Sequence, residues 1–253
     1  MIYEDLKGKK VLVTGSSSGI GAVAAKMFAQ QGCFVGVHYF KTKEGGEKTL
    51  EEVKKLSDGC LLRADMRDEQ QAGKMVTAFA ETARGIDILI NNAGTLVGRM
   101  NFTEATLEFY EDVFATNTRS TFLATRAAVP YLKQSKGNIV NIGSVAGHHG
   151  GGAGAGIYAA AKAAVATMTI SMAMEFARFG VRVNSVLPGF IETRFHEQFS
   201  PPQRKKAVAY KTPLQRNGTA EDVANVILFL ASEAASFITG EYIAVNGGLY
   251  MRA

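Results

Sequence analysis

The most chemically suggestive pair of residues in this chain of 253 residues is Tyr158 and Lys162. They stand four positions apart in an Ala-rich stretch with helical character, so their side chains lie on one helix face, one turn apart. A free phenol has a pKa near 10, and a nearby ammonium is expected to lower that pKa. The pair predicts a tyrosine that gives a proton to a substrate oxygen in one direction of a reversible reaction and removes that proton in the other direction. Core packing is the alternative for a helical tyrosine.

Ser144 is a third candidate, because it directly follows an apolar run of strand length at residues 138–143. A hydroxyl at a strand end can donate a hydrogen bond to a substrate oxygen and stabilise charge that develops there. A serine that simply begins a loop is the alternative. The Gly-rich passage at residues 147–156 follows and is expected to be a flexible loop.

Glycines mark a second kind of site between a predicted strand at residues 10–14 and a predicted helix at residues 21–31. Free backbone N–H groups and the helix dipole attract an anion at such a junction, and glycines let a pyrophosphate approach the backbone. The spacing differs from the G-x-G-x-x-G fingerprint and from a Walker A loop, and a plain glycine turn is the alternative. The expected nucleotide-binding residues here are Gly15, Ser17, Ser18, Gly19, Ile20 and Gly21.

Two further strand ends point to the same site. Asn92, Ala93 and Gly94 come after the predicted strand at residues 86–91, and Asp65 and Met66 come after the one at residues 60–64. Parallel strands bring their carboxyl ends to one sheet edge, where open α/β sheets bind ligands. A turn or cap role is the alternative for Asp65.

The elements that position these residues alternate between strand-like and helix-like segments. Strands are expected at residues 10–14, 34–39, 60–64, 86–91, 138–143, 181–187 and 242–245. Helices are expected at residues 21–31, 44–56, 69–83, 107–133, 158–179 and 221–231. Asp68 and Thr219 are predicted helix N-caps. The pattern predicts an α/β fold, with one domain over residues 1–253 and a Rossmann-type doubly wound parallel sheet of about seven strands.

Charge narrows the classes of partner. The net charge of +5 and a pI near 9.1 would suit a polyanion, but basic and acidic residues are mixed along the chain. No recognised nucleic-acid-binding module is visible, so nucleic-acid binding is not expected. The densest basic cluster, at residues 204–206, is interpreted as a solvated helix face or as an attraction for an anionic cofactor or substrate.

The sequence gives no sign of a metal site, of a secretory signal or of a membrane span. The four histidines show no metal-ligand spacing, so no metal site is predicted. Cys33 and Cys60 lack C-x-x-C spacing, which fits a reducing cytoplasm. Residues 1–10 do not resemble a secretory signal, and Lys162 interrupts the apolar stretch at residues 157–176. The chain is therefore expected to be soluble and cytoplasmic, without a membrane span.

In this order and spacing, T-G-S-S-S-G-I-G, N-N-A-G, Ser144, Tyr158-Ala-Ala-Ala-Lys162 and Pro188-Gly189 closely resemble the motifs of the short-chain dehydrogenase/reductase family. The resemblance covers nearly the whole chain. It implies an NAD(P)-dependent oxidoreductase that interconverts a ketone and a secondary alcohol by hydride transfer, with Asn117 holding a water that links Lys162 to solvent. It also implies that Lys162 bonds the nicotinamide ribose. The residues implied to hold the nicotinamide carboxamide are Pro188, Gly189, Ile191 and Thr193.

A nucleotide-binding regulatory protein that has lost catalysis is the rival hypothesis from another class. It predicts a damaged catalytic set, whereas Asn117, Ser144, Tyr158 and Lys162 are all present. The sequence therefore favours an enzyme.

Tyr39, at the end of the second predicted strand, bears on the choice of cofactor. An NAD-selective site usually has an acidic residue there, which accepts the ribose hydroxyls and repels a 2′-phosphate. Here Lys41 and Lys43 follow Tyr39 and offer cations, so NADP(H) is predicted to be preferred, with NAD(H) also used. Ser18 argues for a moderate preference, because many NADP-dependent relatives carry a basic residue at that position.

The chain most resembles bacterial 3-oxoacyl-[acyl-carrier-protein] reductases, which makes a 3-oxoacyl thioester the leading substrate and a small ketone, sugar or steroid the alternative. Ser135 and Phe179 argue against acyl carrier protein as a partner, because docking members tend to have basic residues there, although Lys136 and Arg178 stand beside them. An aromatic and basic segment at residues 194–212 is expected to cover the substrate. The apolar circumference of the helix at residues 158–179 predicts a homotetramer, or at least a dimer.

Overall fold

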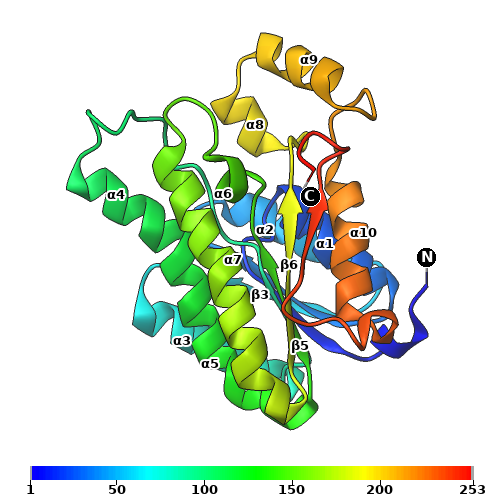
Figure 1. Ribbon diagram of the computed structural model, residues 1–253. Helices are drawn as coiled ribbons and strands as arrows, with labels where there is room; N and C mark the ends of the chain where they lie inside the picture. Colours follow the sequence, from blue (N-terminus) through cyan, green and yellow to red (C-terminus); the bar gives the residue numbers. More distant parts are fainter. Residues whose placement is uncertain (1, 252–253) are drawn as a thin grey trace.

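A seven-stranded parallel sheet forms the centre of the computed structural model, which describes residues 2–251 apart from the side chains of His196 and Pro202 (Figure 1). The strands lie in the order β3-β2-β1-β4-β5-β6-β7. The order reverses between β1 and β4, and open α/β sheets bind ligands in the crevice at such a switch point. The strands are β1 (Lys10–Val13), β2 (Phe34–Tyr39), β3 (Gly59–Arg63), β4 (Ile88–Asn91), β5 (Asn138–Ile142), β6 (Arg182–Pro188) and β7 (Tyr242–Val245).

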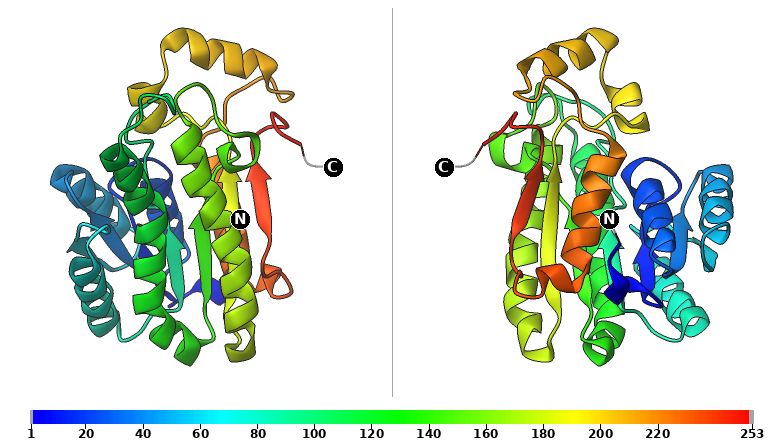
Figure 2. Two further views of the ribbon diagram at one scale, coloured as in Figure 1. Left: turned by 60° about the vertical axis from the view of Figure 1, so that its left-hand side comes forward. Right: turned by 90° about the vertical axis from the view of Figure 1, so that its right-hand side faces the viewer.

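Helices cover both faces of this sheet (Figure 2). One layer holds α1 (Gly19–Gln30), α2 (Lys43–Lys54) and α10 (Ala220–Ala231), and the other holds α3 (Glu69–Ala83), α5 (Ser120–Ser135) and α7 (Gly156–Phe176). Strand residues alternate between the two cores, since Val11 and Val13 pack in the first layer and Leu12 in the second. Because both faces are buried, the strands need continuous apolar sequence, and this confirms the predicted doubly wound sheet.

Shorter helices gather around the carboxyl edge of the sheet. Figure 1 shows α8 (Arg194–Phe199) and α9 (Pro202–Lys211) above the ends of the strands, in the segment predicted to cover a substrate. α4 (Leu107–Phe114) and the single turn of α6 (Ala146–His149) lie at the same end.

Both predicted N-caps are confirmed. The Asp68 carboxylate accepts a hydrogen bond from the Gln71 backbone N–H at 2.9 Å and opens α3. Thr219 and Asp222 bond each other's backbone N–H groups, and this capping box opens α10. Such caps satisfy N–H groups that the first turn of a helix leaves without a partner.

Two predicted elements are wrong in detail. The helix expected at residues 107–133 is interrupted by a π-helical segment, η2 (Ala115–Arg119), which widens one turn between α4 and α5. The passage expected as a loop at residues 147–156 begins inside α6, whose His148 ring stacks at 6.2 Å on the ring of Tyr250. The apolar pattern of the sequence marks neither the π-helical turn nor the short helix α6.

α7 is long and apolar enough, by length and composition alone, to cross a membrane. Half of its apolar stretch is buried against the rest of the molecule, however, and Lys162 is one of the buried residues of α7. Both features are those of a core helix.

His38 ties the β1–α1 turn to the neighbouring strands. Its Nδ1 accepts a hydrogen bond from the Gly15 N–H at 2.8 Å, so its Nε2 carries the proton and donates to the Ala64 carbonyl at 3.1 Å. The Ser16 hydroxyl accepts from the His38 N–H at 2.9 Å and donates to the Val13 carbonyl at 2.8 Å. Burial lowers the pKa of His38, because a second proton would be unhydrated and would face the Gly15 N–H.

We predict that this histidine makes the folded protein sensitive to mild acid. Below about pH 6.5 the unfolded chain binds a proton that the folded protein excludes, so the free energy of unfolding is highest above that pH and decreases below it. The loss is at most about 1.4 kcal/mol per pH unit for one group. Urea unfolding of wild type and of His38→Asn, which keeps an acceptor but does not titrate, measures the effect between about pH 7 and pH 5.

The exposed His149 provides the control, since a His149→Asn variant should keep the wild-type pH dependence. Equal pH dependence in wild type and His38→Asn would contradict this role of His38.

Candidate active site

A cleft of about 700 Å³ opens along the carboxyl edge of the sheet, from the β1–α1 turn to the helices α8 and α9. This volume lies in the range of small-molecule and cofactor sites. The predicted site residues that line the cleft are Gly15, Ser17, Ser18, Gly19, Ile20, Tyr39, Lys41, Asp65, Met66, Asn92, Ala93, Gly94, Ser144, Tyr158, Lys162, Pro188, Gly189, Ile191 and Thr193. Two predicted residues lie directly behind its wall: Gly21, under Asn92, and Asn117, under Gly94.

Two positions at the junction between β1 and α1, Gly15 and Gly21, have no room for a side chain. Gly15 has a φ of +64°, and a Cβ atom there would lie 2.8 Å from the Ala93 Cα. A Cβ atom on Gly21 would collide with the side-chain amide of Asn92, which donates to the Thr14 and Gly15 carbonyls at 2.9 Å each. The two glycine-containing motifs therefore form one unit whose backbone lines the cleft.

The residues around α1 fit the pyrophosphate of a dinucleotide. Gly19, with a φ of +58°, opens α1, and the first turn of a helix leaves N–H groups free for an anion. The Thr193 side chain lies 3.6 Å from the place of a Cβ on Gly19, so the segment after β6 closes over this helix end. Gly189 allows β6 to end against β7, because a Cβ there would lie 2.7 Å from the Asn246 Cβ.

Tyr158 and Ser144 bring two hydroxyl groups together in the cleft. Tyr158 lies in the first turn of α7, and Ser144 follows β5 after Gly143. Burial raises the pKa of Tyr158 to about 12, and a hydrogen bond with Ser144 opposes that rise. The expected lowering of this pKa by Lys162 is therefore wrong, because loss of hydration of the phenolate is the larger effect. A phenol with this pKa is protonated at neutral pH and can act as an acid.

Lys162 is a cation enclosed by the protein. The residue is 5% exposed, and its Nζ donates to the Ile142 carbonyl at 2.7 Å and lies 6.0 Å from the centre of the Tyr158 ring. Burial lowers the pKa of Lys162 to about 8. A Cβ atom on Gly94 would lie 3.2 Å from this Nζ, so the glycine leaves the space in which the ammonium sits below the cleft.

Asn117 reaches the same place from the π-helical segment η2. Its Nδ2 donates to the carbonyls of Thr95 at 2.8 Å and Val113 at 2.9 Å. Its Oδ1 is buried, accepts no hydrogen bond within the part of the chain that the structure describes, and lies 2.7 Å from the place of a Cβ on Gly94. π-Helical turns occur frequently at functional sites, and here the turn aims an amide oxygen toward Lys162.

At the other end of the cleft, an ionic network that the sequence analysis missed surrounds Asp65. The Asp65 carboxylate accepts from Arg67 Nε at 2.9 Å and from Arg67 Nη2 at 2.7 Å. Arg67 also pairs with Asp112 at 2.7 Å, and its guanidinium lies 5.8 Å from the centre of the Phe40 ring. The bond from Arg67 holds the pKa of Asp65 below its usual value. Lys41 lies 5.8 Å from the same ring, so two cations border this end of the cleft.

An aromatic ring borders the cleft beside Tyr158. The Phe195 ring in α8 lines the cleft and lies 6.0 Å from the Tyr158 ring, and the Phe199 ring, which does not line the cleft, lies 5.3 Å from the Phe195 ring. Arg99, which the sequence analysis missed, enters the cleft from the segment between β4 and α4. No motif marks this arginine, so its place depends on the folded chain.

Comparison with known proteins places the chain in a family. Residues 15–250 match the family model described as enoyl-(acyl carrier protein) reductase. The chain is 38% identical to the 3-oxoacyl-[acyl-carrier-protein] reductase FabG of Staphylococcus aureus, over 96% of this chain and 98% of that one. It is 37% identical to the uncharacterized oxidoreductase YgfF of Escherichia coli, over 94% of this chain and 98% of that one.

Solved structures agree with the sequence relatives. The NADH-dependent reductase A1-R′, described as responsible for alginate metabolism, superposes with a TM-score of 0.91 at 35% identity, over 99% of this chain and 100% of that one. The same reductase has also been solved in complex with NAD, with a TM-score of 0.89. The chain thus belongs to the short-chain dehydrogenase/reductase family, as an oxidoreductase that binds a nicotinamide cofactor and acts on carbonyl and alcohol groups.

Proposed function

We propose that the enzyme reduces a ketone to a secondary alcohol, with Tyr158 as the acid that protonates the carbonyl oxygen. The observation that carries this proposal is the pair of hydroxyl groups of Tyr158 and Ser144 in the cleft, with the enclosed Lys162 Nζ 6.0 Å from the centre of the Tyr158 ring. The reduced nicotinamide would supply the hydride. The nicotinamide end of the cofactor would lie along Pro188, Gly189, Ile191 and Thr193, and the pyrophosphate of the cofactor would lie at the start of α1.

Each catalytic side chain has one task in this reaction. Ser144 donates a hydrogen bond to the carbonyl oxygen and stabilises the negative charge that grows there. Tyr158 then transfers its proton to that oxygen, and the Lys162 ammonium stabilises the phenolate that results. Asn117 offers beside Lys162 its Oδ1, which accepts no hydrogen bond from the described residues, as the acceptor for a proton path to solvent. In the reverse direction the phenolate is the base.

We predict that Tyr158→Phe lowers kcat at least a hundredfold while cofactor affinity changes little, because only the transferable proton is lost. Steady-state oxidation of NADPH or NADH with a panel of ketones gives kcat, and cofactor fluorescence titration gives the affinity. Tyr131→Phe, in α5 and away from the cleft, is the matched control and should behave as wild type. Retention of a tenth of the wild-type kcat by Tyr158→Phe would exclude this role.

We also propose that NADPH is preferred over NADH, with both accepted. Tyr39 ends β2 without a carboxylate that would repel a 2′-phosphate, and Lys41 and Arg67 both border this part of the cleft. Lys43, in contrast, does not line the cleft; it begins α2 and pairs with Glu47 at 3.3 Å. Arg67 is held by two carboxylates, which leaves Lys41 as the main source of the preference.

Substitution of Lys41 tests this proposal. A charged hydrogen bond contributes about 1.5 to 3 kcal/mol, so Lys41→Ala should lower kcat/KM for NADPH roughly tenfold to a hundredfold and leave NADH nearly unchanged. Lys43→Ala removes the same charge two positions away and should change neither value by much. An NADH advantage in wild type, or unchanged NADPH kinetics in Lys41→Ala, would refute the preference.

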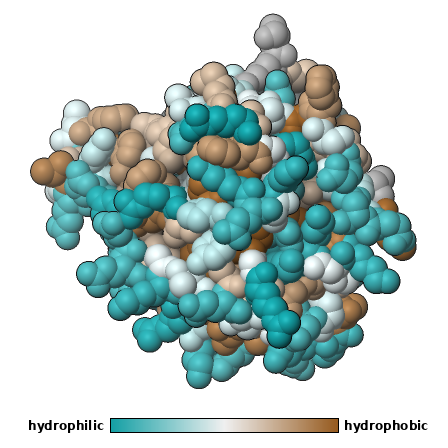
Figure 3. Space-filling model, turned by 90° about the horizontal axis from the view of Figure 1, so that it is seen from below, coloured by the Kyte–Doolittle hydropathy of each residue, from teal (hydrophilic) through white to brown (hydrophobic). Residues whose placement is uncertain are grey.

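The leading substrate remains a 3-oxoacyl thioester, supported by the similarity to FabG. An acyl carrier protein has weaker support as a partner. The basic residues beside Phe179 lie at the end of the molecule opposite the cleft: Lys133 Nζ is 3.9 Å and Arg178 Cζ is 4.7 Å from the centre of the Phe179 ring. Figure 3 shows this end as mostly hydrophilic. Good turnover of a small ketone, without reduction of any 3-oxoacyl thioester, would exclude this substrate. The cytoplasmic location stays a prediction.

A homotetramer, or at least a dimer, is the proposed assembly, because the outer side of α7 has little charge. Ile170 and Met174 are exposed on it, and Lys162, the basic residue within α7, is buried. Soluble monomers rarely expose such an apolar helix side to water, whereas oligomers bury it between subunits. Light scattering should give a multiple of 27.1 kDa at micromolar concentration, and Ile170→Arg should dissociate the assembly. A monomer mass for wild type would refute the proposal.

A further inference from the structure

We propose that the substrates of this enzyme carry an anionic group, a carboxylate or a phosphate, which Arg99 and Arg204 bind at the lid end of the cleft. The proposal rests on the reductase function proposed above and names the substrate class of the same site. Both arginines line the cleft, Arg99 from the segment between β4 and α4 and Arg204 from α9. Guanidinium groups bind carboxylate and phosphate through paired, charge-assisted hydrogen bonds.

Arg99 is held in place by the backbone on both sides of the cleft. Its Nη1 donates to the Ala153 carbonyl at 2.8 Å, and its Nε donates to the Phe199 carbonyl at 3.3 Å. The adjacent Met100 N–H donates to the Gly154 carbonyl at 3.0 Å. The arginine therefore joins the loop after α6 to the lid helix α8, and its orientation is fixed before a ligand binds.

A strained turn directs the chain toward this position. The Gly98 N–H donates to the Leu96 carbonyl at 2.8 Å, which closes a three-residue turn around Val97. Val97 has a φ of +65°, which is rare and strained for a β-branched residue. Such strain persists only where the surroundings enforce it, and here it lies on the segment that delivers Arg99 to the cleft.

No carboxylate in the described part of the chain pairs with the two arginines. Among residues 2–251, neither Arg99 nor Arg204 forms an ion pair with a carboxylate, whereas Lys205, next to Arg204, pairs with Glu192 at 3.0 Å. Burial and the nearby charge of Arg204 lower the pKa of Arg99. Two like charges held close together repel each other, and an anion between them removes that cost.

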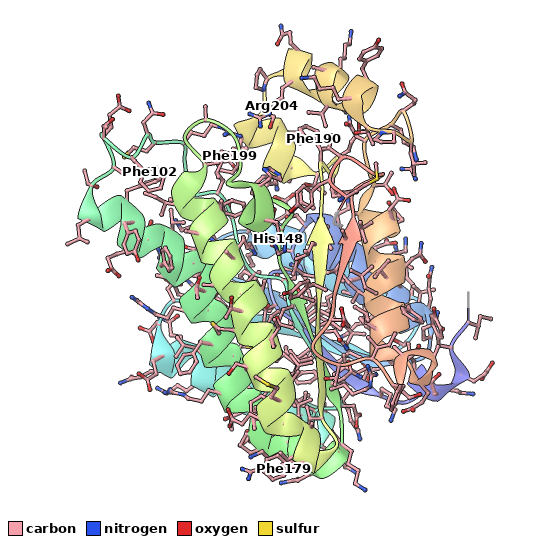
Figure 4. The ribbon with its side chains drawn as sticks, in the orientation of Figure 1. Phe102, His148, Phe179, Phe190, Phe199 and Arg204 are labelled. Carbon is pink, nitrogen blue, oxygen red and sulfur yellow. The ribbon has the colours of Figure 1, made fainter. Side chains whose placement is uncertain are left out.

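The rings between the catalytic hydroxyl groups and the arginines suggest the rest of the substrate. Phe195 adjoins Tyr158, Phe199 adjoins Phe195, and the Phe199 carbonyl contacts Arg99. Figure 4 labels Phe199, in α8, and Arg204, in α9, at the lid end of the molecule. A ligand that places its carbonyl at Tyr158 would lay an apolar part along the Phe195 ring, which lines the cleft, and its anion at the arginines.

Matched substrates with and without the charge test the proposal. At saturating cofactor, kcat/KM is compared for 5-oxohexanoate and its methyl ester, and for acetoacetyl-CoA and the neutral S-acetoacetyl-N-acetylcysteamine. The first pair tests a carboxylate and the second tests a phosphate. Wild type should prefer the charged member of at least one pair. Arg204→Gln should reduce that preference roughly tenfold to a hundredfold, and Arg204→Lys should restore part of it.

Lys206→Gln is the control, because it removes one positive charge from the same lid helix outside the cleft and should leave the preference unchanged. Arg99 is less suited to substitution, since it also supports two backbone segments. Equal kcat/KM for charged and neutral members in wild type, or an unchanged preference in Arg204→Gln, would overturn the anion site and leave the reductase function standing.

A binding measurement separates failure of the anion site from failure of the reductase function. Calorimetric titration with hexanoate, with hexyl phosphate and with hexanamide requires no turnover, and at least one of the two anions, but not hexanamide, should bind in an Arg204-dependent manner. Arg204-dependent binding of either anion without reduction of any ketone would support the anion site and refute the reductase function. Absence of both binding and turnover would overturn both proposals.

Discussion

The burial of the Lys162 ammonium is the constraint on which the rest of the site depends. A charged group in the interior loses hydration and needs an acceptor, and here that acceptor is the Ile142 carbonyl at the end of β5. The cation also needs space, which Gly94 provides because it has no side chain. The amine thus ties α7 to the end of β5 and favours glycine at the end of the N-N-A-G motif.

The doubly wound sheet supplies what this amine requires. Parallel strands end together, so β1, β4, β5 and β6 deliver the glycine turn, Gly94, Ser144 and the Pro188 segment to one edge without a long loop. The π-helical segment adds Asn117 from the layer outside the sheet. Tyr158 then stands one helical turn from Lys162, where burial keeps its phenol protonated and next to Ser144. The groups proposed to act on the substrate therefore all lie near the carboxyl ends of the strands.

Much of this arrangement could be predicted from the sequence, because its signals are local. The four-residue spacing places Tyr158 and Lys162 on one helix face, and the glycines identify the turn before α1. Features that arise from distant contacts could not be predicted. Arg99 bonds Phe199, 100 positions away, and Arg67 bonds Asp112, 45 positions away, with no pattern to announce either. The predicted lowering of the Tyr158 pKa was wrong for the same reason, since the burial that raises this pKa is a property of the assembled cleft.

The enclosed state of Lys162 is the central claim, and the pKa of its amine tests it most directly. Lysine labelled with ¹³C at Cε can be titrated by NMR, with the Lys162 resonance assigned by its absence from a Lys162→Arg variant. The structure predicts a pKa of about 8 for this amine, because burial disfavours its charged form. A Lys162 that titrates near 10.4, as a hydrated lysine does, would contradict the account.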